Sequence, residues 1–388
     1  MSIIIGIDAS RNRSGGAKAH LIGVLTGDDP RKYGISKVHL WAYRSLINSI
    51  PDSPWLVKHS PAVLEKSLLS QLWWQYKNLP QEARELGCNI MLNTDAGSIC
   101  PFYPSITISQ DMLSFEPGEI SRFWPSKAWL RLFLLKYIQA YSLKKSYGAI
   151  FLTQHASKVI QETTGEIKKF KIIPHGVSEV FQAVGLARKD KFYKSSEKKL
   201  EEIKLLYVSN AALYKHQWQV IKAVDTLKKQ SFSVSLLLVG GGSGKAQKLL
   251  EQALNQVDPE QKFIQQQPFV KHEEIPSYLS QADIFIFASS CENMPNTLLE
   301  AMASALPIAC SDRGPMPEVL ENGGVYFNPE DTESISRAIQ KIINGGVQLQ
   351  EQLGLRALEI SKKYSWERCA SETWAYLQEC VTELAGKN

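Results

Sequence analysis

The stretch IFIFASSCENMPNTLLEAMASALPIACS, residues 284–311, decides the fold class of this chain. It opens with an apolar run typical of a buried strand, continues through a polar loop, and becomes helical in composition after Pro295. The segment PIACS then supplies a second strand. A strand, a helix and a strand in this order join parallel strands, so we predict an α/β fold.

The same alternation extends outward from this stretch in both directions. Downstream of residue 203 we expect further strands at 204–209, 234–241, 263–269 and 325–328, separated by helices. The first half of the chain shows a comparable series, with strands expected at 3–7, 37–43, 88–93, 105–110, 148–153 and 170–174 and helices at 17–27, 62–77 and 126–146. Each series predicts a doubly wound, Rossmann-like domain.

A chain of 388 residues is long enough for about two to three domains. The Lys-rich stretch between 176 and 202 is poor in core residues, so we expect an N-terminal domain over 1–185 and a second over 186–365. We expect residues 366–388 to form an amphipathic helix that packs back on the first domain. Two such domains would face a central cleft, where α/β proteins bind ligands.

The composition excludes several classes of protein. Its 44% hydrophobic and 21% charged residues are average for a globular chain, which argues against disorder, collagen and coiled coil. Apolar runs are too short for a transmembrane helix, and the N-terminus does not resemble a signal peptide. Six scattered Cys without CxxC spacing favour free thiols in the cytoplasm over a disulfide framework or zinc site.

Two familiar phosphate-binding motifs fail at GGGSGK, residues 240–245. A P-loop needs Gly where Val239 stands and Ser or Thr where Ala246 stands, and GxGxxG needs Gly at Lys245. The sequence therefore gives no support for an ATPase or an NAD dehydrogenase. The segment remains either a tight turn after a strand or a place where backbone approaches a ligand.

The loop and helix after residue 288 carry a more specific signal. Asn296 is a good N-cap, and we expect the backbone N–H groups of Thr297 and Leu298 to be free at the positive end of a helix, which suits a phosphate. Glu292 lies in the loop and Glu300 lies two turns inside the helix. Eight residues of helix span about 12 Å, so the two carboxylates would contact different parts of one ligand.

These residues resemble the donor-site segment of group 1, family 4 glycosyltransferases, which have the GT-B fold. The resemblance rests on the E-x7-E motif from Glu292 to Glu300 and on its continuation as EAMASALPIACSDRGPMPEV, residues 300–319. It covers essentially the whole chain, because other segments align in order: DASRNRSGGAKAHL (8–21), KIIPHGV (171–177), YVSNAALYKHQWQVIKAV (207–224), LLLVGGGS (236–243), FVKHEEIPSYLSQADIFIFAS (269–289) and YSWERCA (364–370).

The resemblance implies a site for a nucleotide-diphosphate sugar. Glu300 would bind the ribose hydroxyls, Glu292 would lie beside the sugar, and Lys215 would contact the diphosphate. Backbone at Gly15 and Gly16 would approach the same phosphates. The base would lie against Phe269 and Val270.

Two departures from the family pattern affect this site. Asn210 stands where the family has an Arg at the diphosphate, so one positive charge is missing. Gln110 stands where the family often has a His, and Gln cannot shuttle a proton. The neighbouring Asp111 could take the catalytic role or could simply cap a strand end, while His20 and His175 are further candidates that favour a structural role.

The reaction implied is sugar transfer with retention of anomeric configuration, to a glycan or lipid-linked acceptor in cell-surface polysaccharide or lipopolysaccharide assembly. The resemblance implies no cofactor beyond the donor substrate, and the sequence shows no DxD motif placed for a metal. A non-catalytic nucleotide-sugar-binding protein remains an alternative, as does another nucleotide-sugar enzyme such as an epimerase. A phosphorylase would need a pyridoxal lysine site, for which there is no signal.

Charge is unevenly distributed along the chain. Residues 1–185 contain 21 Lys and Arg against 14 Asp and Glu, and no acidic residue lies between Glu119 and Glu162. Basic and aromatic side chains alternate from Arg122 to Lys145, which suits an anionic membrane surface. We therefore expect a peripheral protein on the inner face of the membrane, although the same helix could be buried by its aromatic face. No nucleic-acid motif is present.

Overall fold

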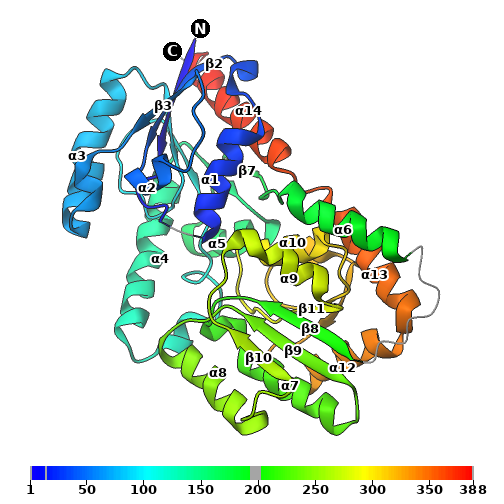
Figure 1. Ribbon diagram of the computed structural model, residues 1–388. Helices are drawn as coiled ribbons and strands as arrows, with labels where there is room; N and C mark the ends of the chain where they lie inside the picture. The colour runs from blue at the N-terminus through cyan, green and yellow to red at the C-terminus, as the bar shows by residue number, and fades with distance from the viewer. Residues whose placement is uncertain (1, 14, 193–201, 387–388) are drawn as a thin grey trace. The chain divides into compact units, whose positions relative to one another are not determined.

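The computed structural model describes residues 2–13, 15–192 and 202–386 and divides into two compact units. Unit 1 comprises the chain up to Gly176 together with the chain from Tyr364 onward, and unit 2 comprises Val177–Lys363. Each unit contains one parallel sheet with helices packed beside it (Figure 1). The predicted α/β class with two Rossmann-like domains is confirmed.

The sheet of unit 1 has seven parallel strands in the order β3-β2-β1-β4-β5-β6-β7. Its centre is fully buried: every residue of β4, β5 and β6 is shielded from solvent, as expected for a sheet covered on both faces. The strands are β1 (Ile3–Asp8), β2 (Ile35–Trp41), β3 (Leu56–His59), β4 (Ile90–Asn93), β5 (Ser105–Ile108), β6 (Gly148–Phe151) and β7 (Phe170–Ile172).

The helices of unit 1 follow its strands, as the alternation predicts. The expected helix at 62–77 is instead a short 3₁₀ turn followed by a longer helix that Ser67 caps through the Ser70 N–H. The helices of unit 1 are α1 (Gly15–Gly27), η1 (Pro30–Tyr33), α2 (Arg44–Ile47), η2 (Ala62–Glu65), α3 (Leu68–Glu85), η3 (Ile120–Phe123), α4 (Lys127–Lys145), α5 (Gln154–Thr164) and α14 (Trp366–Ala385).

Helix α14 belongs to unit 1 because its apolar stripe packs on α1. Trp374 and Leu377 on that stripe are completely buried. Two glycines of α1 make the close approach possible: a Cβ at Gly23 would lie 2.1 Å from the Trp366 ring, and one at Gly27 would lie 2.4 Å from the Trp366 carbonyl oxygen. The C-terminal helix that returns to the first domain is therefore present, as predicted.

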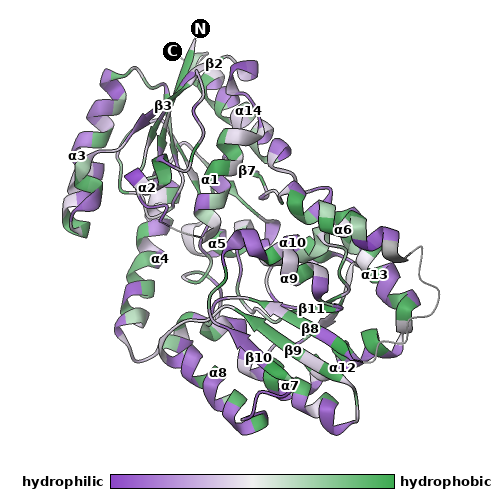
Figure 2. Cartoon of the chain, viewed as in Figure 1, coloured by the Kyte–Doolittle hydropathy of each residue, from purple (hydrophilic) through white to green (hydrophobic). Residues whose placement is uncertain are grey.

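The sheet of unit 2 has six parallel strands in the order β10-β9-β8-β11-β12-β13, the doubly wound order of dinucleotide-binding domains. Figure 2 shows hydrophobic residues along β8 and β11, the two central strands. The strands are β8 (Ile203–Val208), β9 (Val234–Val239), β10 (Ile264–Gln267), β11 (Ile284–Phe287), β12 (Ile308–Ser311) and β13 (Gly324–Phe327).

The described part of unit 2 includes two helices that the sequence pattern does not predict, α6 (Glu179–Phe192) and α13 (Gly346–Ser361). Part of the expected interdomain segment is helix α6, whose Phe181 is buried in unit 2, so the units divide earlier than residue 185. Residues 193–201 of that segment lie outside the described residues. The helices are α6 (Glu179–Phe192), η4 (Leu213–Lys215), α7 (Gln217–Lys229), α8 (Gly244–Val257), η5 (His272–Glu274), α9 (Ile275–Gln281), α10 (Asn296–Ala303), α11 (Met316–Leu320), α12 (Thr332–Asn344) and α13 (Gly346–Ser361).

Candidate functional site

The order of strands in unit 2 creates a switch point between β8 and β11. The chain moves outward from β8 to β9 and β10, then returns to the other side of β8 as β11. Loops leaving two such strands diverge at their carboxyl ends, which is where α/β domains bind ligands. Lys215 follows β8 and Glu292 follows β11, so both residues lie in these loops.

Hydrogen bonds fix the two loops to each other. The Ser290 N–H donates to the Tyr214 carbonyl oxygen at 2.8 Å, and the Ser290 hydroxyl lies 3.0 Å from Nε2 of His216. The buried Tyr207 hydroxyl donates to the Lys215 carbonyl oxygen at 2.7 Å. The backbone that carries Lys215 is therefore held from two sides.

Lys215 and Glu292 form an ion pair across the switch point. Their side chains are only 11% and 15% exposed, so little water screens the pair. The Lys215 ammonium also lies 5.3 Å from the Tyr214 ring centroid and 5.4 Å from that of Phe287. A cation held among aromatic rings, with one carboxylate partner among the described residues, is well suited to bind a second anion, such as a phosphate.

The glycine-rich segment after β9 serves close packing of loops. A Cβ at Gly240 would lie 2.2 Å from the Ser209 carbonyl oxygen, and one at Gly242 would lie 2.7 Å from that of Ala211. The Ala211 N–H donates to the Gly241 carbonyl oxygen at 3.1 Å. These contacts support the interpretation of GGGSGK as a tight turn.

The other predicted donor residues that follow β8 and β10 are more exposed. Asn210 is exposed in the loop that carries Lys215. Phe269 is 77% exposed and Val270 is partly exposed in the loop after β10. An aromatic side chain this exposed is available for stacking.

The first turn of α10 differs from the prediction. Helix α10 begins at Asn296, its cap position is Pro295, and no side chain caps it. The Leu298 N–H is not free, because it donates to the Pro295 carbonyl oxygen at 3.0 Å, and the Leu298 side chain is completely buried. The expectation of an Asn296 N-cap with a free Leu298 N–H is therefore wrong. Asn296 and Thr297 remain partly exposed at this turn.

Glu300 lies inside α10 with its side chain only 10% exposed. Its Oε1 is 2.7 Å from Nε2 of His272, a residue that sequence reasoning did not single out. The hydrogen bond that His272 donates to Glu300 raises the pKa of His272 above its ordinary value. The Oε2 atom of Glu300 is buried and has no hydrogen-bond partner within the part of the chain that the structure describes.

In unit 1, Asp111 has local partners. Its Oδ1 accepts from the Leu113 N–H at 3.0 Å, and Nε2 of Gln139 lies 3.5 Å from its Oδ2. Burial raises the pKa of this carboxyl. Asp111 is therefore arranged as a carboxylate that caps a loop, which is the structural alternative to a catalytic role.

The residues around His20 are buried together. Gln110 donates to the Thr94 carbonyl oxygen at 2.9 Å and lies 3.2 Å from Nδ1 of His20. His20 stacks on His175 at 4.7 Å, and burial holds the pKa of His20 well below its ordinary value. A neutral, stacked imidazole supports the structural role expected for His20 and His175.

The switch point of unit 1 lies between β1 and β4 and holds a carboxylate network that sequence reasoning missed. Buried Asp8, the last residue of β1, accepts from the Ser10 hydroxyl at 2.6 Å, from Gln75 at 2.6 Å and from the Ser98 hydroxyl at 2.9 Å. A carboxylate at a strand end was the available signal, but two of its partners, Gln75 and Ser98, come from distant parts of the chain. Gly15, with φ +66°, begins α1 beyond this network, followed by Gly16.

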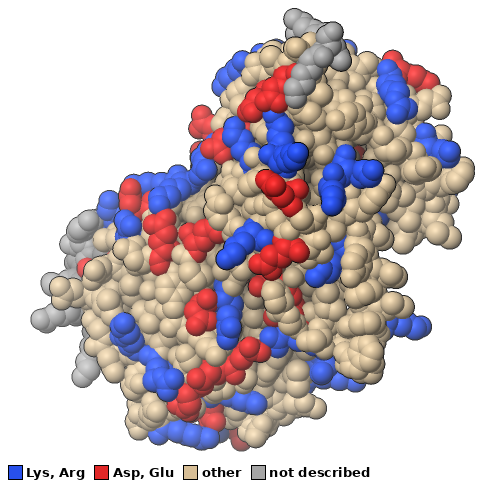
Figure 3. All heavy atoms as spheres, turned by 180° about the vertical axis from the view of Figure 1, so that it is seen from behind, with Lys and Arg blue, Asp and Glu red and all other residues tan. Residues whose placement is uncertain are grey.

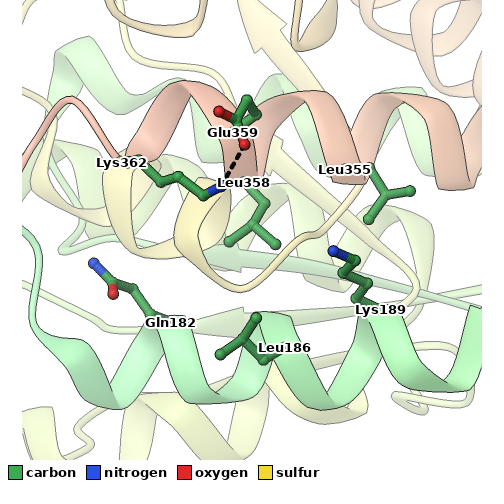
Figure 4. Close-up of a pocket in the computed structure, with 7 residues that line it drawn as sticks. All are labelled: Gln182, Leu186, Lys189, Leu355, Leu358, Glu359 and Lys362. Carbon is green, nitrogen blue, oxygen red and sulfur yellow. Dashed lines mark hydrogen bonds and ion pairs between the residues drawn. The ribbon is translucent and has the colours of Figure 1, made fainter.

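A separate pocket of about 360 Å³ lies within unit 2 between α6 and α13 (Figure 4). Leu186, Leu355 and Leu358 give it an apolar wall, and Lys189 and Lys362 lie at its sides. None of the residues predicted from the sequence lines this pocket.

Among the described residues, no group of three or more His, Cys, Asp or Glu side chains could hold a metal ion. Within the same residues, no helix is both long and apolar enough to span a bilayer.

The fold and the switch-point residues define a two-domain protein of the GT-B class. Known structures support this class across the full length. Sucrose-phosphate synthase from Thermosynechococcus elongatus superposes with a TM-score of 0.76 at 16% identity over 100% of both chains. The Anabaena protein HepE, in complex with UDP and glucose, superposes with a TM-score of 0.70 at 16% identity over 97% of this chain and 99% of HepE.

Sequence comparisons find similarity to glycosyltransferases, which for the family match lies mainly in unit 2. Residues 188–359 match the family of glycosyl transferases group 1. O-antigen chain mannosyltransferase B from Escherichia coli is 30% identical over 27% of each chain, and the amylovoran biosynthesis glycosyltransferase AmsK of Erwinia amylovora is 29% identical over 37% of each. The matched regions thus span about a quarter to about half of the first curated relatives.

Proposed function

We propose that this protein transfers a sugar from a nucleotide-diphosphate sugar to a glycan or lipid-linked acceptor, with retention of anomeric configuration. The observation that carries the proposal is the Lys215–Glu292 ion pair at the switch point of unit 2, inside the segment that matches the glycosyltransferase family. HepE, which shares the fold, has been solved with UDP-glucose. Two relatives are named for O-antigen and amylovoran synthesis, which supports a role in cell-surface polysaccharide or lipopolysaccharide assembly.

Each site residue of unit 2 has a chemical role in this proposal. Lys215 neutralises the diphosphate, and Glu300 accepts hydrogen bonds from the ribose. The first turn of α10, with Asn296 and Thr297, presents the positive end of a helix dipole. The exposed Phe269 ring, followed by Val270, contacts the base.

The transfer step breaks the bond between the sugar C1 and the leaving phosphate oxygen, and the electron pair stays on that oxygen. Lys215 stabilises the charge that develops there. The acceptor hydroxyl oxygen bonds to C1 on the same face, and its proton passes to the leaving phosphate. Glu292 lies beside the sugar in this arrangement. The proposal does not need Asp111, whose oxygens already have partners in the protein.

The proposed reaction uses no cofactor and no metal, because the Lys215 charge and the helix dipole neutralise the leaving phosphate. Turnover should persist in excess chelator. Complete loss of turnover, restored by a divalent cation, would contradict this part of the proposal.

Binding and catalysis need separate tests, because there is a second candidate function, that of a non-catalytic nucleotide-sugar-binding protein. It is favoured by the exposed Asn210, which stands where the family has an Arg at the diphosphate. Thermal shift across UDP- and GDP-sugars would identify the donor. We expect Glu300→Ala to lose the shift, and an unchanged shift would refute the site. Release of nucleoside diphosphate in the presence of acceptor distinguishes a transferase from a binding protein.

Helix α4 supports a membrane-proximal acceptor. It exposes aromatic and aliphatic residues, and hydrophobic and hydrophilic residues alternate along it in Figure 2. This combination fits the interface of an anionic membrane. The exposed apolar residues are Leu130, Phe133, Leu134, Tyr137, Ile138 and Tyr141, and the exposed basic ones are Lys127, Arg131, Lys144 and Lys145.

Peripheral binding to the inner face of the cytoplasmic membrane follows from this proposal. The protein should sediment with vesicles that contain anionic lipid at low salt, and Tyr137→Ser with Tyr141→Ser should weaken that binding. Absence of binding at low salt would contradict it. Nucleic acid is not a proposed partner: on the face shown in Figure 3, acidic and basic side chains are interspersed rather than gathered in a basic stripe.

A further inference from the structure

The 2.7 Å contact between His272 and Glu300 joins two elements of unit 2. His272 lies on η5, after β10, and Glu300 lies on α10, after β11. Their exposure differs sharply, since the His272 side chain is 63% exposed and that of Glu300 is 10% exposed. The imidazole therefore lies between a buried carboxylate and solvent.

The second oxygen of Glu300 is the unusual feature of this pair. Oε2 is buried and lacks a hydrogen-bond partner among the described residues. A buried carboxylate oxygen without a donor costs free energy, and a ligand that supplies an O–H group would recover it. A ribose carries two such groups on adjacent carbons.

The orientation of His272 is set by its other neighbour. The ring of Phe181, a residue of α6 that is only 2% exposed, lies edge-on to the imidazole with centroids 5.7 Å apart. The charged groups that act on His272 are Glu300 from α10 and Glu273 from η5, while α6 contributes the uncharged Phe181. Both carboxylates favour the protonated imidazole.

We propose that His272 is a positioning residue for nucleotide binding: by holding Oε1 of Glu300, it keeps the carboxylate turned so that Oε2 accepts a hydrogen bond from a ribose hydroxyl. This inference rests on the proposed function, because it requires a nucleotide in unit 2. It adds a residue outside the E-x7-E motif to the site.

The first test measures the affinity of the full chain for UDP and GDP by calorimetry. His272→Ala should weaken binding of the preferred nucleotide about five- to tenfold, the scale of the net contribution of one typical hydrogen bond. His272→Gln, which keeps a donor, should recover part of that loss. His155→Ala is the matched control, because His155 pairs with Glu116 at 2.9 Å in unit 1, and it should leave affinity unchanged.

The second test asks whether His272 acts through the ribose. Removing the 2′-hydroxyl, as in dUDP or dGDP, should weaken binding to the natural protein and have a smaller effect on His272→Ala, because coupled contacts are non-additive. The affinity of the natural protein should fall, relative to His272→Gln, as pH rises through the raised pKa of His272. The ratio of these two affinities is used because titration of the nucleotide's own phosphate affects both proteins equally.

The outcomes separate the inference from the proposed function. Failure of the natural protein to bind any nucleotide overturns the proposed function, and the inference with it. Nucleotide binding that is equally strong in folded His272→Ala, with an unchanged preference for the 2′-hydroxyl, overturns the inference alone. The melting temperature of each variant shows that it is folded.

Discussion

Lys215 and Glu292 are each largely removed from water and share one ion pair. Removing one partner leaves the other charge buried without compensation, whereas removing both charges is often nearly neutral. The sequence motif identified the two residues, because both occur at spacings that a family resemblance makes specific. It could not show that they contact each other, since they lie on loops far apart in the chain.

We therefore expect Lys215→Met to lower the free energy of unfolding by about 2 kcal/mol. Glu292→Gln should have a comparable effect, and the double variant should recover most of the loss. Urea denaturation at neutral pH measures this cycle. Simple additivity of the two single effects would contradict a direct pair.

Asp111 gives a prediction that depends on pH. Burial raises its pKa, so the native state disfavours the ionised form, and this cost is present above the raised pKa and absent below the ordinary value of 3.8. Asp111→Asn keeps the acceptor for the Leu113 N–H, and the buried Oε1 of Gln139, which has no hydrogen-bond partner among the described residues, can accept from the new amide.

The Asp111→Asn variant should thus be more stable than the natural protein near pH 7, by about 1 kcal/mol, and the gain should vanish as pH falls to about 4. Thermal unfolding across this range tests the sign. A loss of stability at neutral pH would contradict it. Transfer activity of the variant separately tests the catalytic alternative for Asp111, since an amide cannot accept a proton in its place.

At the scale of elements, the contact of α1 with α14 depends on the absence of side chains at two positions of α1. Gly23→Ala places a methyl group against the Trp366 ring and should destabilise unit 1 by about 1–3 kcal/mol. Gly386→Ala, where the new Cβ meets only an ordinary 3.7 Å contact, is the matched control. Equal melting temperatures for the two variants would show that α14 can shift away from α1 at no cost.

Helices and strands with a clear pattern of hydrophobic residues were predictable, and those with a weak pattern were not. The stripe on α14 and the apolar runs of β8 and β11 were placed within one or two residues. The pattern does not predict helix α13, because Gly346 and Gly354 interrupt it, and the Lys-rich continuation of α6 favours a linker over a helix. Their helical state depends on packing inside unit 2, which local sequence does not reveal.

At the scale of the whole molecule, the sequence specified two doubly wound units and the residues of one switch point. It did not reveal the contact of His272 with Glu300, or the Gln75 and Ser98 partners of Asp8, because these contacts are made by tertiary structure. Part of the excess of basic residues in the first half of the chain lies on α4, where exposed basic and aromatic side chains occur together. Under the proposed function, this charge serves contact with the acceptor and the membrane rather than the fold.

The most direct test of the central claim is proton NMR of donor turnover. The protein is incubated with the UDP- or GDP-sugar that gives the largest thermal shift, together with a glycolipid acceptor extract. The proposal predicts release of nucleoside diphosphate and a product whose first-formed anomer matches the donor, with turnover much reduced in Lys215→Met. Binding without turnover, or a product of inverted configuration, would contradict it.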